Sequence, residues 1–268
     1  MIISEAAAAE AAQRLEEAER TRTPVRMVSL DHPGMTMDDA YRVQRAWKAL
    51  KLAGGRRVVG HKIGLTSKAM QNALGIDQPD SGFLLDNMVF PDGGAVPTGR
   101  FIGLRVEAEL AFVLKTDLAG PERTIFDVLR ATEYVVPALE LLDTRFFRKD
   151  PATGATRTVL DTISDNASNA GIVWGGRPFQ PDQHDLRWVG AICSKNGAVE
   201  ETGLAAGVLN HPATGIAWLA NNLARQGEGL RAGQIVLSGS FIRPVEVGNG
   251  DTINADYGPF GTVSCHFE

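Results

Sequence analysis

The ten residues 105–114 constrain the fold more than any other part of the chain, because their side chains alternate strictly between the two faces of an extended strand. One face carries a row of apolar side chains: Val106, Ala108, Leu110, Phe112 and Leu114. Glu107 and Glu109 leave the opposite face, roughly 7 Å apart along the backbone. A strand with an unbroken apolar face needs a second layer to cover it, so this pattern predicts a packed β-sheet.

The two glutamates on one face permit two interpretations. Neighbouring carboxylates repel each other, and they are tolerated either when water solvates them or when a cation lies between them. The first interpretation predicts a solvent-exposed edge strand, and the second predicts a metal site.

A third acidic residue, Glu140, favours the metal site. It lies in the apolar run 134–142, where an ionised carboxylate is costly unless it is paired or bound to a cation. An ion pair with Arg145 is the alternative. Three carboxylates suit magnesium, manganese or calcium rather than zinc, since hard cations prefer oxygen and the five histidines do not cluster. Pro137 in the same run predicts an edge strand or a bulge.

Lys62 is the cation that such a site needs, because three glutamates and one divalent ion leave a negative charge to which an anionic substrate adds. It lies in the glycine-flanked segment 60–64, which predicts a short strand whose backbone can approach a ligand closely. A lysine there can balance charge or transfer a proton. The alternative is a lysine on the solvent-exposed side of a strand.

Four further polar residues are weaker candidates. Asp80 can act as an acid or base, although its Gln-Pro-Asp-Ser-Gly context is also typical of a turn. Ser164, Asp165 and Ser240 lie in short polar stretches that can offer hydroxyl or N–H groups to a substrate carboxylate. Ordinary turns have the same composition.

The first 55 residues have helical patterns. Ser4 can cap one helix, and Thr36, followed three residues later by Asp39, gives a capping-box signal for a second helix that ends at Gly54.

From residue 56 onward the chain is rich in strands, with a hairpin signal at Asn196-Gly197 and a helix expected from Pro212 to about residue 225. The sequence contains no internal repeat or low-complexity linker. We therefore expect one α+β catalytic domain over 1–268, in which a helical segment, 1–55, packs on a β-rich core, 56–268.

Composition excludes several classes of protein. The formal net charge is −5, and basic residues are scattered, so no nucleic-acid-binding face is expected. No window is apolar enough to span a membrane, and the N-terminus lacks the pattern of a signal peptide. Two cysteines, Cys193 and Cys265, permit a disulfide, but a reduced cytoplasmic protein is the simpler interpretation.

Five segments together resemble the hydratase/decarboxylase family of the fumarylacetoacetate hydrolase superfamily: residues 60–67, 106–112, 137–140, 163–167 and 206–215. The resemblance extends over nearly the whole chain and implies a mixed β-roll with a helical N-terminal segment, assembled as a homo-oligomer. It also implies that Glu107, Glu109 and Glu140 bind Mg²⁺ or Mn²⁺, and that Lys62 and Asp80 act as acid–base residues.

The activity that the resemblance implies is a metal-dependent hydro-lyase of aromatic meta-cleavage catabolism. Such an enzyme adds water to a 2-hydroxy-2,4-dienoate and gives a 4-hydroxy-2-oxo acid. A diacid substrate needs a second cationic contact, for which several residues stay open: Arg26, Arg145, Arg148, Lys149 and Arg157. Hydration of a monoacid and decarboxylation of a 2-oxo diacid are the alternatives, and a non-catalytic partner subunit is a third that the three glutamates disfavour.

Overall fold

The computed structural model describes residues 2–268, without the side chains of residues 70, 73 and 74. Its N-terminal part consists of three helices: α1 (Glu5–Thr21), α2 (Val28–Asp31) and α3 (Met37–Ala53). The Ser4 hydroxyl caps α1 by accepting the Ala7 N–H, and Thr36 and Asp39 form a reciprocal capping box at α3. Both predicted helix starts are confirmed.

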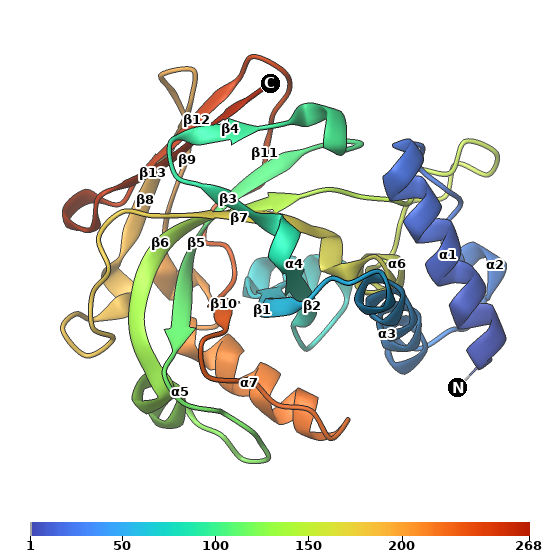
Figure 1. The fold of residues 1–268 in the computed structure, drawn as a ribbon, viewed down its shortest axis with the longest axis horizontal. Coiled ribbons are helices and arrows are strands. Elements are labelled where there is room, and N and C mark those ends of the chain that lie inside the picture. The colour runs from blue at the N-terminus through green and yellow to red at the C-terminus, as the bar shows by residue number, and fades with distance from the viewer. Residues whose placement is uncertain (1) are drawn as a thin grey trace.

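A curled sheet forms the centre of the molecule (Figure 1). In the described part of the chain it has eight strands, in the order β2-β1-β10-β5-β6-β7-β3, with β11 also paired to β5. The strands are β1 (Val58–Gly64), β2 (Asp80–Leu85), β3 (Val89–Pro91), β5 (Arg105–Leu114), β6 (Thr132–Leu142), β7 (Asn169–Trp174), β10 (Ile235–Leu237) and β11 (Val245–Glu246). The sheet is mixed, because β1 and β10 are parallel whereas β5, β6 and β7 are antiparallel.

A second sheet lies beside the first in Figure 1 and has the order β4-β13-β12-β8-β9. Its strands are β4 (Gly94–Val96), β8 (Gly190–Lys195), β9 (Ala198–Leu204), β12 (Thr252–Asp256) and β13 (Thr262–Phe267). The predicted hairpin joins β8 to β9, and both Asn196 and Gly197 have the positive φ that a tight two-residue turn requires.

Short helices connect the strands: α4 (Lys68–Leu74), α5 (Ile125–Ala131), α6 (Val159–Ser164) and α7 (Pro212–Ala224). Among residues 2–268, no helix has the length and apolar character needed to cross a membrane. Cys193 and Cys265 are both buried as free thiols.

Both faces of β5 are buried, although the sequence predicted an apolar layer on one face only. Its alternating apolar side chains belong to one core cluster, and Ala111 and Val113 belong to a second. The second cluster also contains Leu15 of α1 and Trp47 of α3, so the N-terminal helices cover that face. Glu109 is fully buried between these layers, and the interpretation of the glutamates as a solvated edge is therefore wrong.

The prediction from Pro137 is also wrong, because β6 is a central strand between β5 and β7. Pro137 pairs with Leu110 without a register shift at that position. The ladder with β7 begins only at Ala138, and the Pro137 carbonyl accepts the N–H of Gly175, just beyond β7. The nitrogen of Pro137 thus faces the side on which the hydrogen-bond ladder with β7 has ended. No ladder hydrogen bond is lost there, so a proline is tolerated in this central strand.

Candidate metal centre

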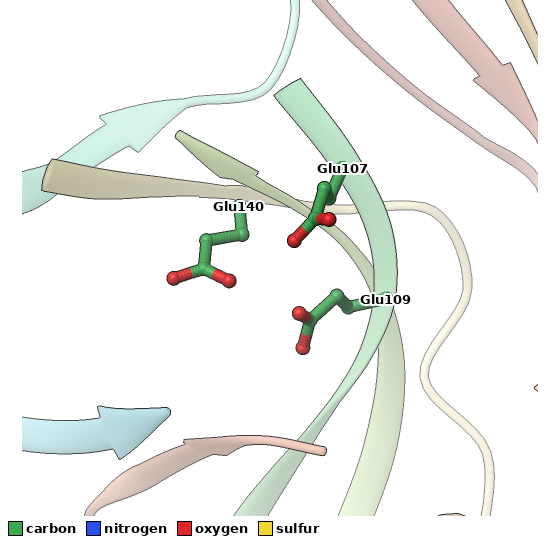
Figure 2. A group of neighbouring side chains, drawn as sticks. All are labelled: Glu107, Glu109 and Glu140. Atoms are coloured by element: carbon green, nitrogen blue, oxygen red, sulfur yellow. The ribbon is translucent and has the colours of Figure 1, made fainter. Parts of the chain in front are cut away.

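The register of β5 and β6 brings three glutamates together. Glu107 pairs directly with Glu140 across the two strands, and Glu109 lies two residues further along β5 on the same face. Figure 2 shows the three carboxylates turned toward a shared space, and one oxygen from each lies within 4.8 Å of the others. The structure therefore gathers the three carboxylates that the sequence singled out.

In each of the two buried glutamates, the protein holds one carboxylate oxygen and leaves the other free. Glu109 Oε2 accepts the Gly239 N–H at 2.9 Å, and Glu140 Oε1 accepts the Asn169 side-chain amide at 2.7 Å. Glu109 Oε1 and Glu140 Oε2 have no hydrogen-bond partner among the described residues. A buried carboxylate oxygen without a partner is unfavourable, and a hard cation removes that cost. The donor set thus fits a divalent metal ion.

The three carboxylates disfavour one another's ionisation. Burial, and then the charge of Glu140, raise the pKa of Glu107 to about 8, although Lys62 and Arg105 oppose the rise. Burial and the neighbouring glutamates also raise the pKa of Glu109 well above its ordinary value. A divalent cation would reverse this balance by stabilising the ionised forms.

Lys62 contacts one of the three glutamates directly. Its Nζ lies 3.3 Å from Glu140 Oε1, although β10 and β5 separate the strands of the two residues, so the contact depends on the curl of the sheet. Burial lowers the pKa of Lys62, but Glu140, Asp80, Glu107 and Glu109 together raise it above its ordinary value. The alternative of a surface lysine is wrong, because Lys62 is 4% exposed.

The alternative interpretation of Glu140, an ion pair with Arg145, is wrong. Arg145 is fully buried and pairs instead with Asp165, donating from Nε to Oδ1 and from its backbone N–H to Oδ2. Its guanidinium also donates to the backbone carbonyl of Asn169. Arg145 therefore supports the backbone of the residue that holds Glu140.

Asp80 begins β2 and lies opposite Gly64 of β1, beside Lys62. A Cβ atom on Gly64 would lie 2.3 Å from Asp80 Oδ1 and 2.9 Å from Lys62 Nζ, so the close approach of these side chains requires glycine there. Burial raises the pKa of Asp80 to about 6, against the opposing charge of Lys62. Asp80 can thus gain and lose a proton near neutral pH.

Three further residues support the centre: Asn169, Gly239 and Tyr257. Asn169 and Tyr257 were not singled out from the sequence, whereas Gly239 lies with Ser240 in a short polar stretch that was expected to offer N–H groups to a carboxylate. The Tyr257 hydroxyl donates to the Ala138 carbonyl at 2.6 Å and accepts the Glu109 N–H at 3.1 Å, which fixes the backbone of β5 against β6. Gly239 has φ +114°, and a Cβ there would lie 2.4 Å from Thr66 Oγ1. Glycine therefore allows its N–H to reach Glu109.

The three predicted substrate-binding residues occupy different places. Ser240 lines the cavity described below, with its hydroxyl donating to the Ile242 carbonyl. The Ser164 hydroxyl donates to the Leu160 carbonyl, and the Asp165 carboxylate binds Arg145. The structure does not bring Ser164 or Asp165 to the cavity wall, so their contact with a substrate stays a prediction.

A cavity of about 570 Å³ opens beside the carboxylates, within the range of small-molecule sites. Lys62, Asp80 and Glu107 line it. Arg105, Arg157 and Arg243 line it as well, and only Arg157 was among the five cations considered from the sequence. Among the described residues, Arg26, Arg145, Arg148 and Lys149 do not contribute to this wall.

Comparisons with known proteins found relatives that align with nearly the whole length of this chain. No protein-family model matches. The chain is 59% identical over 256 residues, 96% of both chains, to a 2-oxo-hept-4-ene-1,7-dioate hydratase from Escherichia coli. At 36% identity it superposes, with a TM-score of 0.93 over 99% of both chains, on a 4-oxalocrotonate decarboxylase from Pseudomonas putida G7 complexed with magnesium and adipate. A yeast fumarylacetoacetate hydrolase family protein, 15% identical, covers 78% of this chain and 91% of its own, and shares the fold with a TM-score of 0.56.

Proposed function

Because this chain belongs to the hydratase/decarboxylase family of the fumarylacetoacetate hydrolase superfamily, we propose that it is a metal-dependent hydratase of 2-hydroxy-2,4-dienoates. Its proposed substrate is the seven-carbon diacid that the E. coli relative is named for, and the product is a 4-hydroxy-2-oxo acid. The observation that carries the proposal is the pair of partnerless carboxylate oxygens, one on Glu109 and one on Glu140, beside a cavity lined by Lys62 and Asp80.

Glu107, Glu109 and Glu140 are the proposed ligands of the metal. Magnesium is the proposed ion because the structural relative contains it, and manganese meets the same oxygen ligands. When bound, such an ion supplies positive charge that stabilises electron density on the oxygens of a 2-oxo acid.

Hydration of the dienol needs two proton movements at carbon. Loss of the enol proton and protonation at C5 give a conjugated 2-oxo-3-enoate. Water then adds its oxygen at C4, and C3 gains a proton, so the net change is the addition of one water molecule. Asp80 suits these transfers because its pKa is raised to about 6 by burial, against the opposing charge of Lys62. Lys62 keeps a positive charge beside Glu140 that favours the enolate form of the substrate.

The test supplies 2-hydroxyhepta-2,4-dienedioate to the protein with Mg²⁺ and follows the product by mass spectrometry. We expect a gain of one water molecule, and loss of that activity after chelation of the metal. A parallel assay supplies 4-oxalocrotonate, and loss of carbon dioxide from it without hydration of the dienoate would assign the chain to the decarboxylase branch. Retention of hydration in the Glu109→Gln and Glu140→Gln variants would contradict the proposed ligand set.

We also propose that the protein is a homo-oligomer, as the family resemblance implies. Large apolar side chains are exposed on and beside the β8–β9 hairpin: Trp188 (73%), Val199 (63%), Ile192 (49%) and Leu204 (44%). β9 is an edge strand of its sheet, so this face combines exposed apolar surface with unpaired backbone groups. Sedimentation velocity should detect an assembly that Trp188→Glu weakens, whereas a monomeric wild-type chain would contradict the proposal. The free thiols of Cys193 and Cys265 agree with the proposed cytoplasmic location.

A further inference from the structure

Arg157 lines the cavity, and its guanidinium forms no ion pair with an acidic side chain in the described part of the chain. Its Nη1 donates to the hydroxyls of Thr144 at 2.6 Å and Ser168 at 3.1 Å, both of which belong to buried residues. Within residues 2–268, no carboxylate lies close enough to Arg157 to form an ion pair. The two neutral hydroxyls therefore fix the direction of the guanidinium without cancelling its charge.

The other two arginines of the cavity wall differ from Arg157 in this respect. Arg105 pairs with Glu246 at 2.6 Å, and Arg243 pairs with Glu201 at 2.7 Å. Burial lowers the pKa of Arg157, and the neighbouring charges of Arg145 and Arg105 act in the same direction, whereas Asp165 and Asp161 oppose them at longer range. Of these three arginines, Arg157 is thus the one whose guanidinium has no carboxylate partner and is available to an anion that enters the cavity.

Arg157 also lines the same cavity as Glu107, one of the proposed metal ligands. It is among the cations that oppose the rise in the Asp80 pKa, which places its charge within electrostatic range of the acid–base residues. Leu142, Val159 and Phe241 line the same cavity and offer apolar surface to a carbon chain. A chain anchored by its 2-oxo acid end therefore meets apolar side chains and an unpaired cation in one cavity.

We propose that Arg157 binds the distal carboxylate of the substrate and so selects a 2-oxo diacid over a monoacid. This inference rests on the proposed function, because it assumes that the 2-oxo acid end of the substrate lies at the glutamates. A guanidinium suits this role, since its planar fork can donate two parallel hydrogen bonds to a carboxylate.

The kinetic test compares the diacid 2-hydroxyhepta-2,4-dienedioate with the monoacid 2-hydroxypenta-2,4-dienoate. In Arg157→Gln, kcat/KM for the diacid should fall by about 10- to 100-fold, mainly through KM, because a charge-assisted contact is lost. Arg157→Lys should recover part of that loss, and kcat/KM for the monoacid should change by less than about threefold. The matched control is Arg243→Gln, which removes a paired arginine from the same wall and should leave the preference for the diacid in place.

A binding measurement separates this inference from the proposed function. Calorimetric titration of the Mg²⁺-loaded protein with 2-oxoheptanedioate and with 2-oxoheptanoate compares two unreactive ligands of equal chain length. The wild type should prefer the dicarboxylate, and Arg157→Gln should lose that preference even if the chain catalyses a different reaction from hydration. An equal loss for both ligands, or a preserved preference, would overturn the assignment.

Discussion

Asn169 offers the most discriminating substitution at the proposed metal centre. Its side-chain amide donates to Glu140 Oε1 at 2.7 Å, and Lys62 Nζ lies 3.3 Å from the same oxygen. These two contacts leave Glu140 Oε2 as the free oxygen. Asn169→Ala removes the shorter contact and allows the carboxylate to rotate.

A hydrogen bond to a charged group contributes about 1.5–3 kcal/mol, which corresponds to roughly 10- to 150-fold in a binding constant. Residues that orient metal ligands typically change metal affinity by about 10- to 100-fold. Because Lys62 still contacts Oε1 in the variant, we expect the dissociation constant for Mg²⁺ to rise by about 10- to 30-fold.

Calorimetric titration of Mg²⁺ into the metal-free protein measures this change directly. Activity at saturating Mg²⁺ should recover most of its wild-type value, since the substitution weakens the site without removing a ligand. Asn254→Ala is the matched control, because Asn254 is an exposed asparagine on β12 of the second sheet, whereas Glu140 lies on β6 of the first. Unchanged metal affinity in Asn169→Ala, or a loss of activity that excess metal does not restore, would refute the positioning role.

Two further substitutions test the supports of the site and of the N-terminal segment. Burial raises the pKa of Asp39, but hydrogen bonds from Thr36, Ile3 and Ile2 outweigh it and lower the pKa to about 2. The stabilisation from the ionised carboxylate is therefore present above the unfolded pKa of about 3.9 and is lost as the pH falls toward 2. Chemical denaturation should show that Asp39→Asn is less stable than the wild type at pH 6, and that the difference in unfolding free energy narrows between pH 4 and pH 2. A difference in unfolding free energy that does not depend on pH would contradict this. Gly239→Ala should destabilise the fold by about 1–3 kcal/mol and weaken Mg²⁺ binding, because the backbone φ at position 239 is +114° and the new Cβ meets Thr66. In the control Gly248→Ala the new Cβ meets no neighbouring atom, so Mg²⁺ binding should not change. Equal metal affinity in Gly239→Ala and the wild type would show that the Gly239 N–H does not orient Glu109.

Local signals in the sequence predicted the local structure well. The capping residues Ser4 and Thr36 begin helices, Asn196-Gly197 forms a hairpin, and Pro212 begins α7, because each signal acts through bonds within a few residues. The alternation at Glu107 and Glu109 likewise placed both side chains on one face of β5.

Features that depend on distant segments were missed or predicted wrongly. Pro137 is tolerated in a central strand because β7 ends beside it. Lys62 was predicted as the nearby cation, but its direct contact with Glu140 depends on the curl of the sheet, and the alternative partner Arg145 does not reach Glu140. Neither fact is encoded near these residues in the sequence.

The turn that delivers Asn169 is the clearest example. Asn166, Ala167 and Ser168 all have positive φ, between 51° and 60°, although none of them is glycine. Tertiary contacts hold this turn, including the exchange of hydrogen bonds between the Asn166 side chain and the backbone of Phe83. No local pattern could have predicted a left-handed turn at this position.

The most direct test of the metal centre is a titration of Mn²⁺ into the metal-free protein, followed by electron paramagnetic resonance, for the wild type and the Glu109→Gln and Glu140→Gln variants. One tightly bound ion per chain in the wild type, with affinity reduced by at least about 100-fold in each variant, is the expected result. Tight binding of Mn²⁺ in both variants would contradict the proposal that the three glutamates form the metal site.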